Sequence, residues 1–357
     1  MQLVAIIGAG ASVAEAASHR PVHTAEHPPL DTNFFSKVAE LGPLPLRATL
    51  STFAASAGIP DPFARPEPRM EQFFGDIYFE LVDSDGVARE AALDAYRALL
   101  RLYTRVLAGT TNWLHDRRLG AIGRLMRDVV QLEHLERLTL VTFNHDLVLE
   151  NALVQLPYRR RWCVDQGYGP IALRPVPTTR RGLRLPRHSS ECDHNIQIEL
   201  LKLHGSLNWQ VATRSHDPSY RDLFPPTEAV PSIECITDRV VSVALERKIG
   251  RRRWRLWPQI VPPIYQKMDI VSARFGMLWR YASAALEQAD RVLMVGYSMP
   301  STDVHAEKLI GRAIRRNLSL KTLDVVNPDH SIASRVAGIG GLERVNWYRD
   351  LSLYRPG

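Results

Sequence analysis

Cysteine is scarce in this chain of 357 residues. There are three, Cys163, Cys192 and Cys235, and no two of them form a Cys-x-x-Cys pair. A zinc site of the paired-cysteine kind needs such pairs, and three scattered cysteines are not the pattern of a disulfide framework. We therefore expect no zinc, no disulfides and a reduced, cytoplasmic setting.

Long apolar runs are also missing. No stretch reaches the roughly eighteen apolar residues that a membrane-spanning helix needs, so we expect no membrane partner. The apolar segment 1–11 lacks a basic leader and enters a glycine motif directly. That arrangement is typical of a buried first strand and not of a signal peptide.

No nucleic-acid-binding motif accompanies the basic charge of the chain. The net charge is +7 at pH 7, and the densest basic clusters are Arg251-Arg252-Arg253-Trp254-Arg255 and Arg159-Arg160-Arg161. Basic runs with an interleaved aromatic could contact nucleic acid or an acidic partner. A solvated face is the more common reason for such runs, so the sequence leaves a nucleic-acid partner open.

The first motif is a strand that runs into a glycine turn. The apolar run 3–7 is followed by Gly8-Ala9-Gly10-Ala11-Ser12 and then by helix-forming residues. Glycines let the backbone approach a pyrophosphate, and free N–H groups at the helix start face it. Val13 stands where a dehydrogenase fingerprint has its third glycine, and the expected acidic residue about twenty positions on is absent. Two interpretations of this motif therefore remain: a nucleotide site of another kind, or a tight turn without a ligand.

Four more apolar runs, 138–142, 196–203, 291–295 and 321–326, end in polar clusters. Carboxyl ends of parallel strands meet in one crevice, where open α/β sheets bind ligands. The plainer alternatives are that Asn144 or Asp146 caps a helix and that His204 is a structural histidine. The clusters are Thr142-Phe143-Asn144-His145-Asp146, His204-Gly205-Ser206, Gly296-Tyr297-Ser298 and Asn327-Pro328.

The order of these runs predicts an α/β fold with a doubly wound, Rossmann-like parallel sheet. Segment 30–135 shows only helical patterns, notably an amphipathic stripe over 91–107 that we assign to the core, so it predicts a helical insertion or small domain. The Rossmann-like domain then comprises 1–29 and 136–357. We expect loops over 157–192 and, apart from one candidate helix, over 210–250. An extended segment at 256–263 and a last strand at 343–348 complete the expectation.

Together the five clusters, in this order and spacing, resemble the sirtuin superfamily. The resemblance runs from residue 3 to residue 330 and is nearest to bacterial sirtuin-like domains that hydrolyse NAD⁺ in anti-phage defence. It implies a sirtuin-type NAD-binding fold with NAD⁺ as substrate. The resemblance implies that Gly8, Ala9, Gly10, Ala11 and Ser12 bind the pyrophosphate, that Gly296 and Ser298 contact phosphate or ribose, and that Thr142 makes a cofactor contact. It implies that Asn327 contacts the adenosine ribose and that Asp146 holds the nicotinamide carboxamide. Asn144 would position the nicotinamide ribose or the attacking water, and His204 would be the general base.

Departures from the deacylating sirtuins favour water over acyl-lysine as the acceptor. The paired-cysteine zinc module is absent, and Phe143 replaces a glutamine of the family pattern. Where those enzymes have a strand that pairs with the substrate peptide, this chain reads Ile260-Val261-Pro262-Pro263-Ile264, and prolines lack the donors that such pairing needs. We expect segment 28–35, and not the family-like stretch 58–63, to cover the nicotinamide.

The resemblance therefore implies an NAD⁺ glycohydrolase (NADase) that acts as an antiviral effector in the cytoplasm. As partners it implies NAD⁺, further copies of the chain in a homo-oligomer, and an activating protein such as an ATPase. Two alternatives stay open at this point. One is a protein deacylase or ADP-ribosyltransferase, and the other is a non-catalytic nucleotide-binding module.

Overall fold

The computed structural model describes most of the chain. The described residues are 1–19, 27–64, 68–117, 120–156, 162, 167–169, 172–173, 197–213, 232–233, 235–236, 246–249, 252–261, 268–300 and 303–356. Cys163, Cys192 and the basic cluster 159–161 lie outside them.

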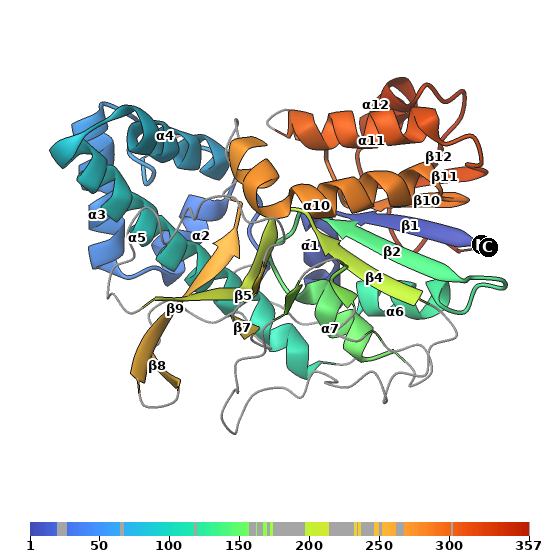
Figure 1. Ribbon diagram of the computed structural model, residues 1–357, viewed down its shortest axis with the longest axis horizontal. Helices are drawn as coiled ribbons and strands as arrows, with labels where there is room; N and C mark the ends of the chain where they lie inside the picture. Colours follow the sequence, from blue (N-terminus) through green and yellow to red (C-terminus); the bar gives the residue numbers. More distant parts are fainter. Residues whose placement is uncertain are drawn as a thin grey trace.

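A six-stranded parallel sheet forms the centre of the molecule (Figure 1). In sequence order its strands are β1 (Gln2–Ile7), β2 (Arg137–Thr142), β4 (Gln197–Lys202), β10 (Arg291–Val295), β11 (Thr322–Val326) and β12 (Asn346–Tyr348). The spatial order β12-β11-β10-β1-β2-β4 places the first strand between two halves that wind in opposite directions. That is the order of a doubly wound nucleotide-binding sheet, so the predicted fold class is confirmed.

Apolar strands and helices on both faces bury this sheet. Leu3, Val4, Ala5, Ile6 and Ile7 of β1 are each at most 2% exposed, as a central parallel strand requires. Helices α1 (Ala9–Ala17), α6 (Ala121–Val129) and α7 (Val148–Val154) lie on one face of the sheet, and α10 (Met268–Glu287), α11 (Val304–Arg316) and α12 (Ser331–Gly340) lie on the other (Figure 1).

The regular elements described between α1 and β2 are all helical, as the sequence patterns predict. It contains α2 (Phe34–Leu41), α3 (Leu44–Ala57), α4 (Met70–Asp83), α5 (Gly86–Thr111) and a 3₁₀ turn over Asn112–Asp116. Helices α2 to α5 form a group beside the sheet (Figure 1). Phe34, Phe35, Phe73 and Tyr103 pack edge to face or tilted within this group.

A second sheet corrects the prediction for 210–250. Strands β5 (Gly205–Thr213), β7 (Cys235–Ile236), β8 (Glu246–Ile249) and β9 (Arg252–Ile260) form an antiparallel sheet in the order β7-β5-β9-β8. Two-residue strands β3 (Ala172–Leu173) and β6 (Ser232–Ile233) pair separately. The loop prediction is wrong because β5 pairs with β9, and the resulting hydrogen bonds leave no pattern in the local sequence. The pairing also shifts register between Ser206 and Gln210. The extended segment predicted at 256–263 is confirmed as far as Ile260.

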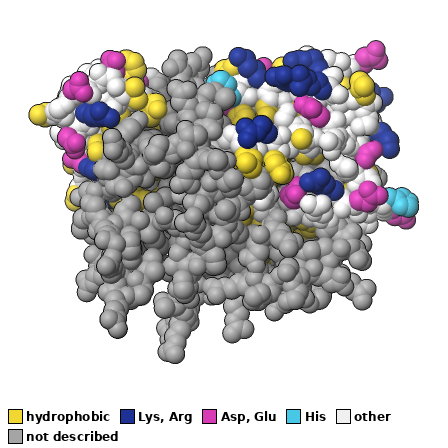
Figure 2. Space-filling view, viewed as in Figure 1, with side chains coloured by type: hydrophobic (Ala, Val, Ile, Leu, Met, Phe, Trp, Pro, Cys, Tyr) yellow, Lys and Arg dark blue, Asp and Glu magenta, His cyan; other side chains and the backbone are white. Residues whose placement is uncertain are grey.

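The exposed face of α11 is basic. Lys308, Arg312, Arg315 and Arg316 are exposed along it, and Figure 2 shows basic side chains gathered over this part of the molecule. The arginines over 252–255 that the sequence singles out lie in β9. Within the described residues, none of the helices combines the length and the apolar character needed to cross a bilayer.

The turns that follow β1 and β10 are in direct contact. Gly8 N donates to Val295 O over 2.9 Å, and Gly10 N donates to Gly296 O over 3.0 Å. A Cβ on Gly8 would lie 2.4 Å from Tyr297 Cα and 2.6 Å from the Gly296 oxygen. Both neighbours are backbone atoms, so only glycine fits here.

We expect Gly8→Ala to lower the free energy of unfolding by about 1–3 kcal/mol or more, because overpacking against backbone must separate the two turns. Gly75→Ala in α4 is the matched control. A Cβ there meets nothing within 4 Å, and replacing a helical glycine should raise stability by roughly 0.5–1 kcal/mol. Urea denaturation of both variants measures the difference, and equal stabilities would contradict the proposed contact.

Candidate functional site

A cavity of about 690 Å³ lies at the carboxyl ends of β1, β2, β10 and β11. The first turn of α1, the loop 28–32, the start of α4, α5 and residues 349–351 also contribute to its wall. The predicted site residues in this wall are Ala9, Gly10, Ala11, Ser12, Asn144, Asp146, His204, Gly296, Ser298 and Asn327. Gly8 and Thr142 are the predicted site residues that lie behind it.

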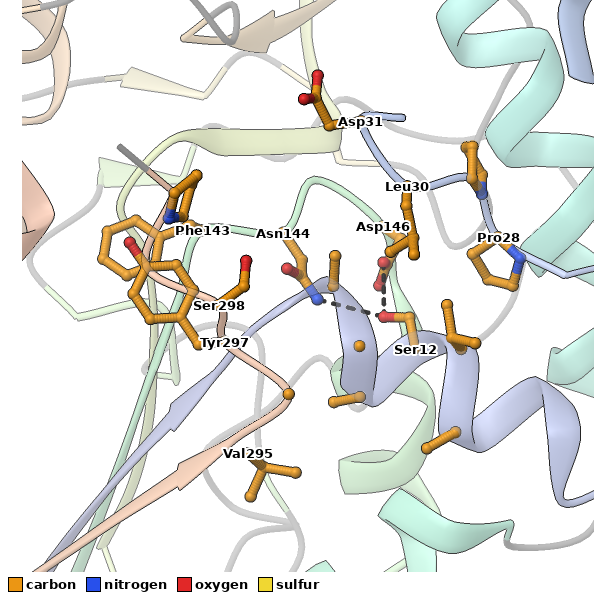
Figure 3. Close-up of a pocket in the computed structure, with 18 of the residues that line it drawn as sticks. Ser12, Pro28, Leu30, Asp31, Phe143, Asn144, Asp146, Val295, Tyr297 and Ser298 are labelled. Carbon is orange, nitrogen blue, oxygen red and sulfur yellow. Dashed lines mark hydrogen bonds between the residues drawn. The ribbon is translucent and has the colours of Figure 1, made fainter. Parts of the chain in front are cut away.

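A hydrogen-bonded chain joins the glycine turn to the segment after β2 (Figure 3). Asn144 Nδ2 donates to Ser12 Oγ over 3.2 Å, and Ser12 Oγ donates to Asp146 Oδ2 over 2.8 Å. Ser12 is 2% exposed and Asp146 is 8% exposed. The orientation of the Asn144 amide is therefore set by α1 and not by its own strand alone.

Asp146 also caps a helix. Its Oδ1 accepts a hydrogen bond from Val148 N, the first residue of α7, over 3.0 Å. Both carboxylate oxygens are thus engaged, one by the Ser12 hydroxyl and one by the helix start. This is the capping role that the sequence left open, and it fixes the whole segment 144–146.

Thr142 and Gly8 support the cavity from behind. Thr142 Oγ1 donates to Ile7 O over 2.7 Å and accepts from Asn144 N over 3.1 Å. These bonds hold the ends of β1 and β2 together immediately before their turns. Gly8 contributes the close approach to Tyr297 described above.

The His204 side chain lies among aromatic rings and is 5% exposed. Its ring centroid is 5.0 Å from that of Phe143 and 6.0 Å from that of Trp279, which is nearly parallel to it. Trp279 Nε1 donates to Leu203 O over 3.0 Å and is thereby fixed. The main-chain oxygen of His204 accepts from Val261 N over 2.7 Å.

A carboxylate that the sequence did not single out faces His204. Asp303 Oδ1 lies 3.9 Å from His204 Nε2, and Asp303 is 3% exposed. The Tyr297 hydroxyl donates to Asp303 Oδ2 over 3.0 Å, and the Tyr297 ring stacks on Phe143 at 4.8 Å. Asp303 directly precedes α11, as an ordinary helix-capping residue would, so the sequence holds no signal that it reaches the histidine.

A second histidine lines the cavity. The Tyr103 hydroxyl lies 2.8 Å from His145 Nδ1, and the His145 and His204 rings are 6.2 Å apart. Tyr103 and Leu107 belong to the stripe over 91–107 that the sequence assigned to the core. Both are buried, and both also line the cavity, so the stripe serves packing and site together.

The start of α1 offers fewer free donors than the sequence suggested. Gly10 N donates to Gly296 O and Ala11 N to Gly8 O, so these two first-turn N–H groups are already used. Charged side chains also line the cavity. They are Arg69, Arg349, Asp31, Glu71 and Asp350 in addition to those already described.

Loop 28–32 covers one side of the cavity and is tied to the helical segment. Asp31 Oδ1 accepts from Glu71 N over 2.9 Å, and Asp31 O accepts from Met70 N over 3.2 Å, so Asp31 caps α4. Pro28 and Leu30 lie beside Asp146 and Ser12 in Figure 3, and Asp31 is also among the lining residues. The stretch 58–63 is not among its lining residues.

Burial controls the ionisation of the tyrosines in this wall. Desolvation first, and then the negative charge of Asp303, raise the pKa of Tyr297 well above its usual value. Desolvation and then Asp146 raise the pKa of Tyr103 in the same direction. Both phenols stay neutral in the folded protein at any ordinary pH. Among the described residues there is no group of three or more His, Cys, Asp or Glu side chains that could hold a metal ion.

Comparisons with known proteins give only remote structural likenesses. No protein-family model matches the chain, and no curated protein matches it. A solved Sir2 homologue mutant in complex with ADP-ribose aligns with 98% of this chain and 86% of its own at 13% identity and a TM-score of 0.42. A Sir2 homologue–NAD complex aligns over 94% and 88% at 14% identity and a TM-score of 0.36. A mutant complex with 2′-O-acetyl ADP-ribose aligns over 96% and 93% at 14% identity and 0.38.

The raised pKa of Tyr297 predicts a loss of stability in alkali. The unfolded phenol releases its proton near pH 10, whereas the folded one does not, so the unfolded state binds fewer protons above that pH. The stabilisation is complete below about pH 10, and unfolding becomes easier by about 1.4 kcal/mol per pH unit above it for each such tyrosine. Tyr297→Phe should reduce the slope of unfolding free energy against pH by that amount.

Urea denaturation between about pH 10 and pH 11 measures this slope. Tyr281→Phe is the control because Tyr281 is 44% exposed and should leave the slope unchanged. If Tyr297→Phe has the same slope as the parent protein, the phenol ionises in the folded state and its bond to Asp303 is not as described.

Proposed function

We propose that this protein is a sirtuin-like NAD⁺ glycohydrolase that cleaves NAD⁺ to ADP-ribose and nicotinamide. The observation that carries the proposal is that Asn144 and His204 line one cavity with the glycine turn of α1. These are the positions at which the sequence motifs resemble the sirtuins.

The cavity suits an elongated dinucleotide. Its volume of about 690 Å³ falls within the usual range for pockets that bind small molecules. The glycine turn brings backbone close to one side, and the exposed Ser298 hydroxyl lies on the turn after β10. Pyrophosphate would lie between these turns, with the adenosine ribose toward Asn327 and the nicotinamide ribose toward Asn144.

The proposed reaction replaces the bond between nicotinamide and ribose with a bond to water. Nicotinamide leaves with the electron pair of the C–N bond and is neutral, while positive charge develops on the ribose. Water then bonds to that carbon, and its proton passes to the His204 imidazole and on to solvent. The protein contributes orientation of the reactants and a general base, which are established sources of rate in such a step.

The backbone next to His204 favours water over a peptide acceptor. Val261 N, in the segment where a deacylase would pair with its substrate, donates to His204 O over 2.7 Å. That donor is therefore occupied within the chain. Phe143 and Trp279 flank His204 with carbon rings.

The biological role that we propose rests on the resemblance alone. An NAD⁺ hydrolase that depletes the nucleotide would act in the cytoplasm as an effector of antiviral defence. Its activity would be held back until the chain assembles with further copies of itself or with an activating protein such as an ATPase.

Asn144→Ala and His204→Ala should each reduce nicotinamide release from NAD⁺ by about 100-fold or more, the usual contribution of a positioned acid–base group. His134→Asn is the control. His134 lies before β2 at the opposite edge of the sheet with φ of 59°, a conformation that asparagine tolerates. Nicotinamide is measured by chromatography, and thermal unfolding confirms that each variant is folded.

The alternatives predict different results with the parent protein. Release that occurs only when an acyl-lysine peptide is added would support a transferase. Binding of NAD⁺ without release, in isolated and assembled forms alike, would support a non-catalytic nucleotide-binding module. Full activity in both the Asn144 and His204 variants would remove the assignment of these residues.

A further inference from the structure

Lys202, the last residue of β4, is a lysine buried inside the protein. Its side chain is 1% exposed. Nζ donates to Glu150 Oε1 over 2.8 Å and, in a short contact, to the main-chain oxygen of Asp146. The Tyr168 hydroxyl also donates to Glu150 Oε1, over 3.0 Å, and Asn208 Nδ2 donates to the Tyr168 hydroxyl over 3.2 Å.

Burying this ion pair costs free energy of folding. Removing a lysine and a glutamate from water costs more than packing two apolar side chains of similar size, and such replacements often stabilise proteins. The bonding is also incomplete, because Glu150 Oε2 has no hydrogen-bond partner among the described residues. Stability alone therefore does not account for the pair.

The position of Lys202 suggests what the pair does. Lys202 stands two residues before His204, and the oxygen that it binds belongs to Asp146, two residues after Asn144. One ammonium group thus joins the two chain segments that carry the proposed catalytic residues. Neutral hydrogen bonds run beside it, from Leu203 N to Thr142 O over 2.9 Å and from Leu207 N to His145 O over 3.0 Å.

We propose that Lys202 is a positioning residue that fixes the spacing of Asn144 and His204 by holding the Asp146 carbonyl at the end of β4. Glu150 keeps the ammonium group in place from α7, and Tyr168 and Asn208 hold Glu150 in turn. Because the reaction depends on the relative placement of ribose, water and base, a small shift of either segment should slow the chemical step more than it weakens binding. This inference rests on the proposed function.

The comparison that isolates the ammonium group is between Glu150→Gln and the double variant Lys202→Met with Glu150→Gln. The introduced glutamine keeps an oxygen that can accept from Lys202 and Tyr168, and the double variant buries no charge at this pair. The two proteins therefore differ by the ammonium group, which is the donor to Asp146 O and which in Glu150→Gln is a buried charge without its carboxylate partner. The double variant should lose about tenfold or more in kcat while KM changes by less than about threefold.

The control is the double variant Arg137→Met with Glu199→Gln. Arg137 Nη2 donates to Glu199 Oε2 over 2.8 Å and joins the same two strands, β2 and β4, at the edge of the sheet away from the cavity. Its loss should leave kcat and KM unchanged. Thermal unfolding of all variants verifies that the proteins compared are folded.

A second measurement does not require activity. Hydrogen exchange of the Leu207 amide should be about tenfold or more faster in the Lys202 double variant than in Glu150→Gln, because the segment that carries its acceptor is released. An unchanged kcat in an active parent protein overturns the proposal. So does unchanged exchange at Leu207, whatever kcat does. A parent protein that releases no nicotinamide refutes the proposed function. Faster Leu207 exchange in the double variant would then still support the role of Lys202 in holding the Asp146 carbonyl.

Discussion

The parallel pairing of β1 with both β2 and β10 is the constraint from which the site follows. Ile7 lies opposite Thr142 on one side and opposite Val295 on the other. The three strands therefore end at one level, and the turns after them are neighbours. A slip of one residue would turn the buried apolar side chains of β1 outward, so the same burial that stabilises the sheet also fixes the register of the turns.

Hydrogen bonds between polar side chains link the turns after these strands to one another and to the interior behind the cavity. Asn144 binds Ser12, Ser12 binds Asp146, and the main chain of Asp146 binds Lys202. The chain of contacts thus runs from the cavity through three elements into the interior. Each member is buried or nearly so, and a buried polar group that loses its partner is costly. Movement of one segment is consequently opposed by the others.

Much of the fold could be predicted because its signals are local. The apolar runs of β1, β2, β4, β10 and β11 and the polar residue after each appear in the sequence, and the order of the runs then predicts the doubly wound sheet. The sheet containing β5 and β9 could not be predicted in the same way, because its strands pair across segments distant in sequence and its register shifts at a bulge.

The site divides along the same line. Asn144, His204 and Ser12 could be predicted because each closely follows a strand of the parallel sheet. Asp303 and Tyr103 could not, because they reach the cavity from helical elements, where a residue before a helix is explained by capping and a tyrosine in an amphipathic stripe by packing. Asp303 faces His204 and Tyr103 contacts His145, and both contacts are tertiary ones that the local sequence does not reveal.

The wall around His204 also bears on which nucleophile attacks in the proposed reaction. A positively charged ribose reacts with whatever nucleophile lies beside it, so neighbouring protein groups must be unreactive. Phe143 and Trp279 present carbon rings. Tyr297 carries a hydroxyl, but this hydroxyl donates a hydrogen bond to Asp303 and burial raises its pKa, so the reactive phenolate does not form. The same desolvation that keeps the tyrosine neutral thereby removes one nucleophile that would compete with water in the proposed reaction.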